Sequence, residues 1–267
     1  MASVIAAYNF CNPDFKAFLD GAADAGFRHV AIGFYKNYLD VPLESLSAAD
    51  EASVKKQLAD RGLTMVAIFG GSNLLDRSGL DLLKKKLDGA ARFGVKALDT
   101  GSFSMTGKTP EKIEADTATF VDQIRRAGDH ADKHGITLCL ETHGGYTGTS
   151  DACLKAMADV KHPRVRIAYD PANFLYYEGA RPEHRLAELI PFIGHTHLKD
   201  HRGGKGNNDF PAIGEGEVGY RSLLPSLEKG GYSGAYTLER AFGQTNEEKA
   251  VSLKKAYALM KELVGGK

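Results

Sequence analysis

Short apolar runs alternate with longer amphipathic segments along the whole 267-residue chain, and this alternation constrains the fold more than any single motif. The short runs have the length of strands, and the longer segments carry apolar residues at helical spacing. The expected strands are 4–8, 29–34, 64–69, 95–100, 136–140, 165–169, 193–198 and 236–239. The expected helices are 16–25, 51–61, 80–93, 111–134, 150–160, 183–190, 220–229 and 247–264.

Prolines and glycines mark the ends of the expected helices. Asn12-Pro13 and Thr109-Pro110 have the form of an N-cap followed by proline in the first turn. Glycines that follow a helical segment and precede a strand predict left-handed caps at Gly26, Gly62, Gly94, Gly135 and Gly231.

Eight strand–helix units with short connections, and no linker rich in Pro, Gly or Ser, favour an α/β fold. We expect a single (β/α)8 TIM barrel over residues 1–267, a length that is usual for this architecture. An open doubly wound sheet is the alternative, but the chain lacks the Gly-rich first turn that such a sheet needs.

Composition narrows the class of protein. The 34 Lys and Arg residues equal the 34 Asp and Glu residues, so no net field attracts nucleic acid or an acidic membrane surface. The cysteines are odd in number and lack paired spacing, which favours free thiols in a reducing compartment. The N-terminus has no basic segment ahead of an apolar stretch, and no run approaches the roughly 18 apolar residues of a membrane helix. We therefore expect a cytoplasmic enzyme or binding protein.

Side chains of metal-ligand type stand at the ends of the last four expected strands, namely Glu141, Asp170, His197 and Glu239. Parallel strands deliver their C-terminal residues to one face, so these four side chains should converge. A single carboxylate at the end of a strand is as readily explained as a helix cap as it is as a metal ligand. Three carboxylates together repel one another, and a bound divalent cation resolves that conflict. The pattern predicts one divalent cation, Mn²⁺ or Mg²⁺ in preference to Co²⁺ or Zn²⁺.

The seventh expected strand offers two imidazoles, His195 and His197, which strand alternation places on the same side. His197 is nearer the end of the strand and is therefore the expected ligand, whereas His195 supports it or fills the core one layer deeper. His143 follows Glu141 by two residues and also points inward. It either contacts substrate or is a structural loop histidine.

A second pair of histidines, His130 and His134, lies one helical turn apart, a spacing that can bind zinc. The neighbouring residues Asp129, Asp132 and Lys133 are instead typical of a solvated helix face. The sequence therefore favours a surface role for this pair.

The segment 200–208 (DHRGGKGNN) combines Arg202 and Lys205 with three glycines. It is either a mobile surface loop or a lid whose cations orient substrate oxygens. Aromatic side chains stand near the ends of the first four strands, as core fillers or as an apolar wall opposite the cation: Tyr8, Phe34, Phe69 and Phe103.

The strand ends resemble the xylose-isomerase-like TIM barrels, the sugar phosphate isomerase and epimerase family. The motifs that carry this resemblance are LETHGG (140–145), YDPANF (169–174), GHTHLKD (194–200), IGEGEVGY (213–220) and YTLER (236–240). The resemblance implies that Glu141, Asp170, His197 and Glu239 are the metal ligands. It also implies that Glu141 and Glu239 are the catalytic acid and base.

The implied activity is isomerisation or epimerisation of a keto-sugar or related polyol. The cation would chelate a carbonyl and the adjacent hydroxyl, and it would stabilise the enediolate that forms when one glutamate removes a proton. A lyase acting on a keto-cyclitol or 3-keto sugar is the runner-up, because loss of a β-hydroxyl from the same enediolate gives dehydration. An apurinic endonuclease, with three zinc ions and a basic surface, and a non-catalytic binding barrel are the remaining alternatives.

The expected substrate-binding residues are His143, Asn173, Lys199 and Arg202. Asn173 departs from the family's epimerases, which often carry histidine there, and Asn cannot carry a proton at neutral pH. Arg202 lies only near the position of the epimerases' loop arginine, whereas Lys199 and Asp200 match a Lys-Asp pair that is widespread in the family. Family members are often dimers or tetramers, so a homo-oligomer stays open.

Overall fold

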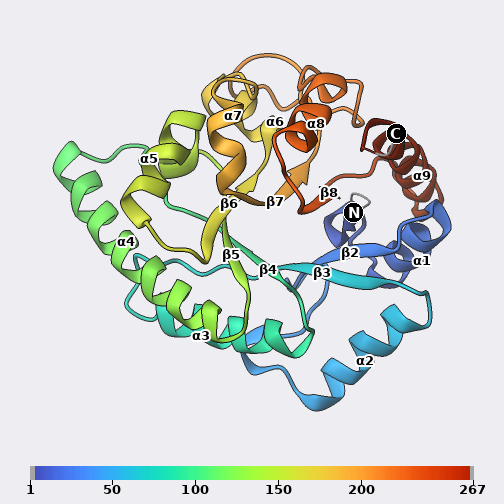
Figure 1. Cartoon of the computed structure of the whole chain (residues 1–267). Helices are drawn as coiled ribbons and strands as arrows, with labels where there is room; N and C mark the ends of the chain where they lie inside the picture. Colours follow the sequence, from blue (N-terminus) through green and yellow to red (C-terminus); the bar gives the residue numbers. More distant parts are fainter. Residues whose placement is uncertain (1–3, 265–267) are drawn as a thin grey trace.

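The computed structural model describes residues 4–264, which form a closed barrel of parallel strands surrounded by helices (Figure 1). Each strand pairs with the next along the chain, and β8 pairs with β1 to close the barrel. This architecture confirms the predicted (β/α)8 TIM barrel, while residues 1–3 and 265–267 of the predicted domain lie outside the described range. The strands are β1 (Val4–Tyr8), β2 (His29–Gly33), β3 (Thr64–Phe69), β4 (Ala97–Thr100), β5 (Thr137–Glu141), β6 (Val165–Tyr169), β7 (Ile193–Leu198) and β8 (Ala235–Leu238).

Helices follow the strands, and most of them lie outside the barrel (Figure 1). They are α1 (Phe15–Ala25), α2 (Ala48–Ala59), α3 (Gly79–Arg92), α4 (Pro110–Lys133), α5 (Ser150–Val160), α6 (Pro171–Asn173), α7 (Leu186–Leu189), α8 (Tyr220–Lys229) and α9 (Asn246–Val264). The glycines predicted as helix stops all have positive φ, which confirms the left-handed conformation expected of them. Among residues 4–264, no helix combines the length and the apolar character needed to cross a membrane.

One predicted helix start is wrong. The N-cap of α1 is Asp14, whose side chain accepts a hydrogen bond from the amide of Ala17 at 2.9 Å. Asn12 instead accepts from the amide of Asp14 at 3.1 Å, so it orders the turn before the helix. At α4 the prediction is confirmed, because Thr109 caps the helix and Pro110 occupies its first turn.

The segment between β6 and β7 also differs from the expected single helix 183–190. Asp170 caps the short α6, which continues into a π-helical turn, Phe174–Glu178, that the sequence did not predict. The following chain turns through Arg185 at a φ of 52°, and only Leu186–Leu189 is α-helical before a 3₁₀ turn, Ile190–Phe192. The irregular turns keep Asn173 and the two tyrosines after Leu175 at the mouth of the barrel rather than on its outer wall.

The inside of the barrel is filled largely by small residues. Its buried apolar cluster consists of Tyr8, Ala31, Ala67, Ala97, Cys139 and Ala168, separate from the larger core between strands and helices. Small side chains on β2, β3, β4 and β6 leave space inside the barrel for the buried polar side chains of β4 and β7. The three cysteines are buried free thiols.

Candidate metal centre

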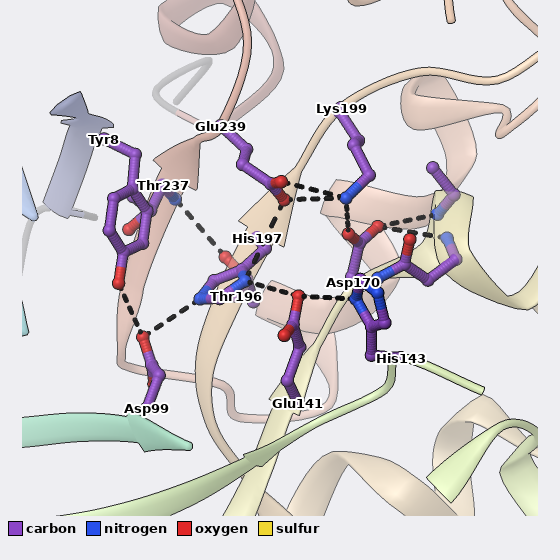
Figure 2. Close-up of polar contacts among 12 residues, drawn as sticks. Tyr8, Asp99, Glu141, His143, Asp170, Thr196, His197, Lys199, Thr237 and Glu239 are labelled. Atoms are coloured by element: carbon purple, nitrogen blue, oxygen red, sulfur yellow. Dashed lines mark hydrogen bonds and ion pairs between the residues drawn. The ribbon is translucent and has the colours of Figure 1, made fainter. Parts of the chain in front are cut away.

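The ends of β5, β7 and β8 bring Glu141, His197 and Glu239 together (Figure 2). Nδ1 of His197 lies 3.4 Å from Oε1 of Glu141 and 3.9 Å from Oε2 of Glu239. The amide of Glu239 donates to the carbonyl of Leu198 at 2.9 Å, so strand pairing continues one residue beyond β8 and fixes this glutamate beside β7. Residues far apart in the sequence therefore meet because they stand at the same end of a closed parallel barrel.

The ammonium of Lys199 connects Asp170 to the group of Glu141, His197 and Glu239. One Asp170 oxygen, Oδ1, caps α6 by accepting from the amides of Ala172 and Asn173. The other, Oδ2, lies 2.6 Å from Nζ of Lys199, which also contacts both carboxylate oxygens of Glu239 at 2.9 and 3.0 Å. Three of the four predicted ligands thus share one cluster, and the Lys199 ammonium joins the fourth to it (Figure 2).

Behind His197 stands Asp99 of β4, a fully buried carboxylate. Its Oδ2 lies 2.9 Å from Nε2 of His197 and 2.6 Å from Nδ1 of His195, and it accepts from the hydroxyl of Tyr8 at 3.2 Å. Nε2 of His195 in turn contacts the hydroxyl of Thr237 at 2.7 Å. His195 is therefore the deeper, supporting histidine that strand alternation allowed, and Asp99 holds both imidazoles.

Charge balance within the centre is set by these contacts. Burial raises the pKa of Asp99, but the charges of His195 and His197 lower it to about 2. Burial also raises the pKa of Glu141, but its contacts with the imidazoles of His143 and His197 outweigh that effect and bring the pKa below its usual range. Both carboxyl groups are therefore ionised at neutral pH.

The pKa values of Asp170, His197 and Lys199 are instead raised. Burial raises the pKa of Asp170 to about 7, with Lys199 lowering it and Glu239 raising it further. Burial lowers the pKa of His197, but Asp99 and Glu141 raise it well above its ordinary value. Burial likewise lowers the pKa of Lys199, and Asp170 and Glu239 raise it above its usual range. The neighbouring carboxylates therefore favour the positively charged forms of His197 and Lys199.

The donor set fits a divalent cation. Nδ1 of His197 is buried and makes no hydrogen bond, and it faces two carboxylates. An imidazole nitrogen with carboxylate oxygens is a ligand set for Mn²⁺ or Mg²⁺, and for Co²⁺ or Zn²⁺ as alternatives. The contact of Nε2 with Asp99 leaves Nδ1 as the nitrogen available to a metal, the usual arrangement of a carboxylate that orients a ligand histidine.

His143 and Tyr177 form a pair at the rim of the centre. Nδ1 of His143 lies 3.4 Å from Oε1 of Glu141, and its Nε2 lies 2.5 Å from the hydroxyl of Tyr177. The hydrogen bond with Glu141 raises the pKa of His143, opposed by partial burial. A donor or acceptor therefore stands within reach of any molecule that contacts Glu141.

A cavity of about 840 Å³ opens above these residues. Glu141, His143, Asn173, Lys199 and Glu239 all line it, together with aromatic side chains that include Phe10, Tyr35, Phe69, Tyr176, Tyr177 and Phe210. Nδ2 of Asn173 is buried and makes no hydrogen bond, so the amide is free to contact a bound molecule. Of the aromatic residues noted in the sequence, Phe69 lines the cavity, whereas Phe34 packs against Phe93 and Tyr8 contacts Asp99.

Arg202 does not line the cavity. Its guanidinium contacts the carboxylate of Asp209 at 3.2 Å and the carbonyl of Glu215 at 2.7 Å, within its own loop. Arg240, directly after Glu239, lines the cavity in its place. The loop is also anchored by Asp200, whose carboxylate accepts from the amides of His201, Gly214, Gly216 and Val218.

Sequence reasoning missed Asp99, Tyr177 and Arg240. The signal for Asp99 was present, because a carboxylate inside an apolar strand needs buried partners, and the strand-seven imidazoles are the available ones. Tyr177 had no such signal, since the π-helical turn that presents it is set by packing.

The comparisons with known proteins agree with the barrel fold. The family model for the xylose isomerase-like TIM barrel matches residues 19–262. Inosose dehydratase 1 of Bacillus cereus is 23% identical over 146 residues, which are 49% of this chain and 49% of that protein. The chain thus aligns with about half the length of this curated relative.

Two solved structures are similar in fold. A xylose isomerase-like TIM barrel protein from Mycobacterium smegmatis, in complex with magnesium, superposes with a TM-score of 0.77 at 23% identity, covering 99% of this chain and 100% of that one. D-allulose 3-epimerase from Methylomonas sp., in complex with D-allulose, gives a TM-score of 0.76 at 18% identity, covering 98% and 97%.

Proposed function

The chain belongs to the xylose isomerase-like TIM barrel family, and we propose that it is a divalent-metal-dependent isomerase or epimerase of a keto-sugar or related polyol. The observation that carries the proposal is the approach of Glu141 and Glu239 to the same imidazole, His197, because both glutamates also line the aromatic cavity. Two carboxylates from different strands can then reach one bound molecule from different sides.

Glu141, His197 and Glu239 would hold the cation, with Asp170 as the fourth ligand. The similar barrel with magnesium and the unpartnered Nδ1 of His197 support this assignment. When bound, the cation would polarise a substrate carbonyl and the adjacent hydroxyl and offset the negative charge that develops on their oxygens.

The protein's own residues supply proton transfer and orientation. One of Glu141 and Glu239 removes the proton from the hydroxyl-bearing carbon next to the carbonyl, and the other returns a proton. Return to the same carbon from the opposite side inverts it, whereas return to the former carbonyl carbon gives the aldose–ketose isomer. Asn173 and Lys199 line the cavity as donors to substrate oxygens, and the aromatic walls reduce the access of water.

A lyase acting on a keto-cyclitol or 3-keto sugar is the second candidate. The similarity to inosose dehydratase 1 favours it, and so does the His143–Tyr177 pair, which places a donor beside Glu141 for a departing hydroxyl group. In that reaction, proton removal is followed by loss of the β-hydroxyl as water, leaving a carbon–carbon double bond.

Incubation with candidate ketoses and keto-cyclitols in D₂O tests both reactions. Deuterium incorporation with no loss of water supports the isomerase or epimerase, whereas an unsaturated product with new ultraviolet absorbance supports the lyase. A protein that binds ligand and catalyses neither exchange nor elimination would be a binding barrel, and the proposal would fail.

We also propose which molecules the protein binds and in which compartment it acts. The substrate is a small sugar or polyol, and neither nucleic acid nor a membrane is expected to bind. We place the enzyme in the cytoplasm, in keeping with its buried free thiols.

A further inference from the structure

A second group of ligand-type side chains lies on the outer wall of the barrel, between α3 and α4. Nε2 of His130 lies 2.7 Å from Oδ1 of Asp88, and Nε2 of His134 lies 2.8 Å from the same oxygen. The three ligand atoms lie within 4.8 Å of one another. The sequence had favoured a solvated face for these histidines, and nothing in it indicated the carboxylate on the preceding helix.

The carboxylate of Asp88 contacts two histidines of α4 rather than the lysines of its own helix. Lys84 and Lys85 precede it by four and three residues on α3, the positions from which a lysine ordinarily pairs with a carboxylate. Among the ion pairs of residues 4–264, none joins Asp88 to either lysine, and both of its ion pairs are to imidazoles. The imidazole rings lie 5.4 Å apart between centroids, tilted by 64°. Both therefore present Nε2 to one point.

The surrounding backbone also favours a cation there. His130 lies in the last turn of α4 and His134 is its C-cap, while Asp88 is close to the C-terminal end of α3 at Arg92. Helix C-termini carry partial negative charge from unpaired carbonyl groups, which stabilises a nearby cation. Burial raises the pKa of Asp88, but hydrogen bonds with His130 and His134 lower it below its ordinary value, so the carboxylate is ionised at neutral pH.

We propose that Asp88, His130 and His134 form a second metal site, for a transition-metal dication such as Zn²⁺. Two imidazoles and one carboxylate are a common zinc ligand set, and a fourth position faces solvent. Tetrahedral zinc with ligands at about 2.0–2.1 Å needs ligand atoms about 3.3 Å apart. The present N···O distances must widen by about half an ångström, which the half-exposed Asp88 side chain achieves by rotation.

The site is separate from the candidate metal centre. In this fold the helices run opposite to the strands, so the C-terminal ends of α3 and α4 lie at the end of the barrel away from Glu141 and Glu239. A metal here would join two neighbouring helices and stabilise the barrel wall. The inference does not depend on the proposed reaction.

Calorimetric titration of the full chain with zinc chloride at pH 7.5, after chelator treatment, tests the site. The native chain should take up one more equivalent of zinc than His134→Ala or Asp88→Asn, and zinc should raise its melting temperature more. His184→Ala is the matched control, because His184 also lies near a carboxylate, Asp151 at 3.5 Å, but has no second imidazole. This control should bind zinc like the native chain.

A zinc equivalent at the candidate metal centre is distinguished by His197→Ala, which should lose that equivalent and retain the outer one. Equal zinc uptake by the native chain and a His130→Ala/His134→Ala double variant would overturn the inference. So would loss of the extra equivalent in His184→Ala, since that would indicate non-specific binding to surface imidazoles.

Discussion

Asp99 and His197 face each other inside the barrel, with Oδ2 of the carboxylate 2.9 Å from Nε2 of the imidazole. The contact joins β4 to β7 across the barrel interior, and it determines which nitrogen of His197 points towards Glu141. A buried carboxylate outside the proposed ligand set therefore orients His197, the proposed histidine ligand.

Asp99→Asn should weaken cation binding by about ten- to a hundredfold, because the amide keeps the shape of the side chain but loses the charge that orients His197. Titration of Mn²⁺ by calorimetry measures the change. Thr237→Val is the matched control, since it removes a contact of His195 and leaves that of His197 with Asp99 in place. Unaltered affinity in a folded Asp99→Asn protein would contradict an orienting role.

Glu239→Gln should retain part of the cation affinity but slow proton exchange by about a hundred- to ten-thousandfold, because an amide cannot accept the substrate proton. Deuterium incorporation followed by nuclear magnetic resonance measures the rate. Glu262→Gln, at a surface glutamate that pairs with Arg221, should exchange like the native chain. Full exchange in Glu239→Gln would remove this residue from the reaction.

Lys199→Met should destabilise the cation-free protein by about 3–5 kcal/mol, because Asp170 and Glu239 lose the ammonium that lies between them. Added Mn²⁺ should recover much of the loss, since a divalent cation compensates the same carboxylates. Thermal unfolding with chelator and with Mn²⁺ gives the two values. Equal losses under both conditions would show that cation and ammonium do not substitute for each other.

Tyr177→Phe separates the two candidate reactions. The substitution removes the hydroxyl that contacts His143 and leaves Glu141, His197 and Glu239 in place. If a departing hydroxyl is protonated through this pair, elimination should slow by about a hundredfold or more while carbon–hydrogen exchange continues. Equal slowing of exchange and product formation would assign the tyrosine to binding instead.

Asp200→Ala should destabilise the protein by about 3 kcal/mol, because the backbone amides that donate to this carboxylate lose their acceptor. The loop between β7 and α8 should then be cleaved more readily by protease, which gel electrophoresis detects. Asp209→Ala, at an exposed residue of the same loop, is the control. Unchanged cleavage would show that other contacts hold the loop.

The alternation of strand and helix segments was sufficient to predict the barrel, since each repeat is a local pattern. The face that carries Glu141, His197 and Glu239 followed from the common direction of parallel strands. Asp99 did not, because its partners Tyr8 and His195 are 91 and 96 residues away, and only three-dimensional packing brings them together.

Local geometry was less predictable where side chains compete for backbone groups. Asn12 and Asp14 can each cap a helix, and the choice of Asp14 depends on the turn that Asn12 stabilises. Similarly, the charge of Arg202 suggested contact with substrate, but its guanidinium is already bound within the loop. Residue type alone does not reveal which partner a side chain takes.

The pairing of β8 with β1 has a consequence for how the protein matures. Glu239 is positioned by the strand that closes the barrel, so the proposed ligand set stays incomplete until β8 has been synthesised and has paired. We therefore expect the nascent protein to bind a cation at this site only after β8 has paired with β1. Metal binding would then stabilise the folded protein relative to partly folded intermediates.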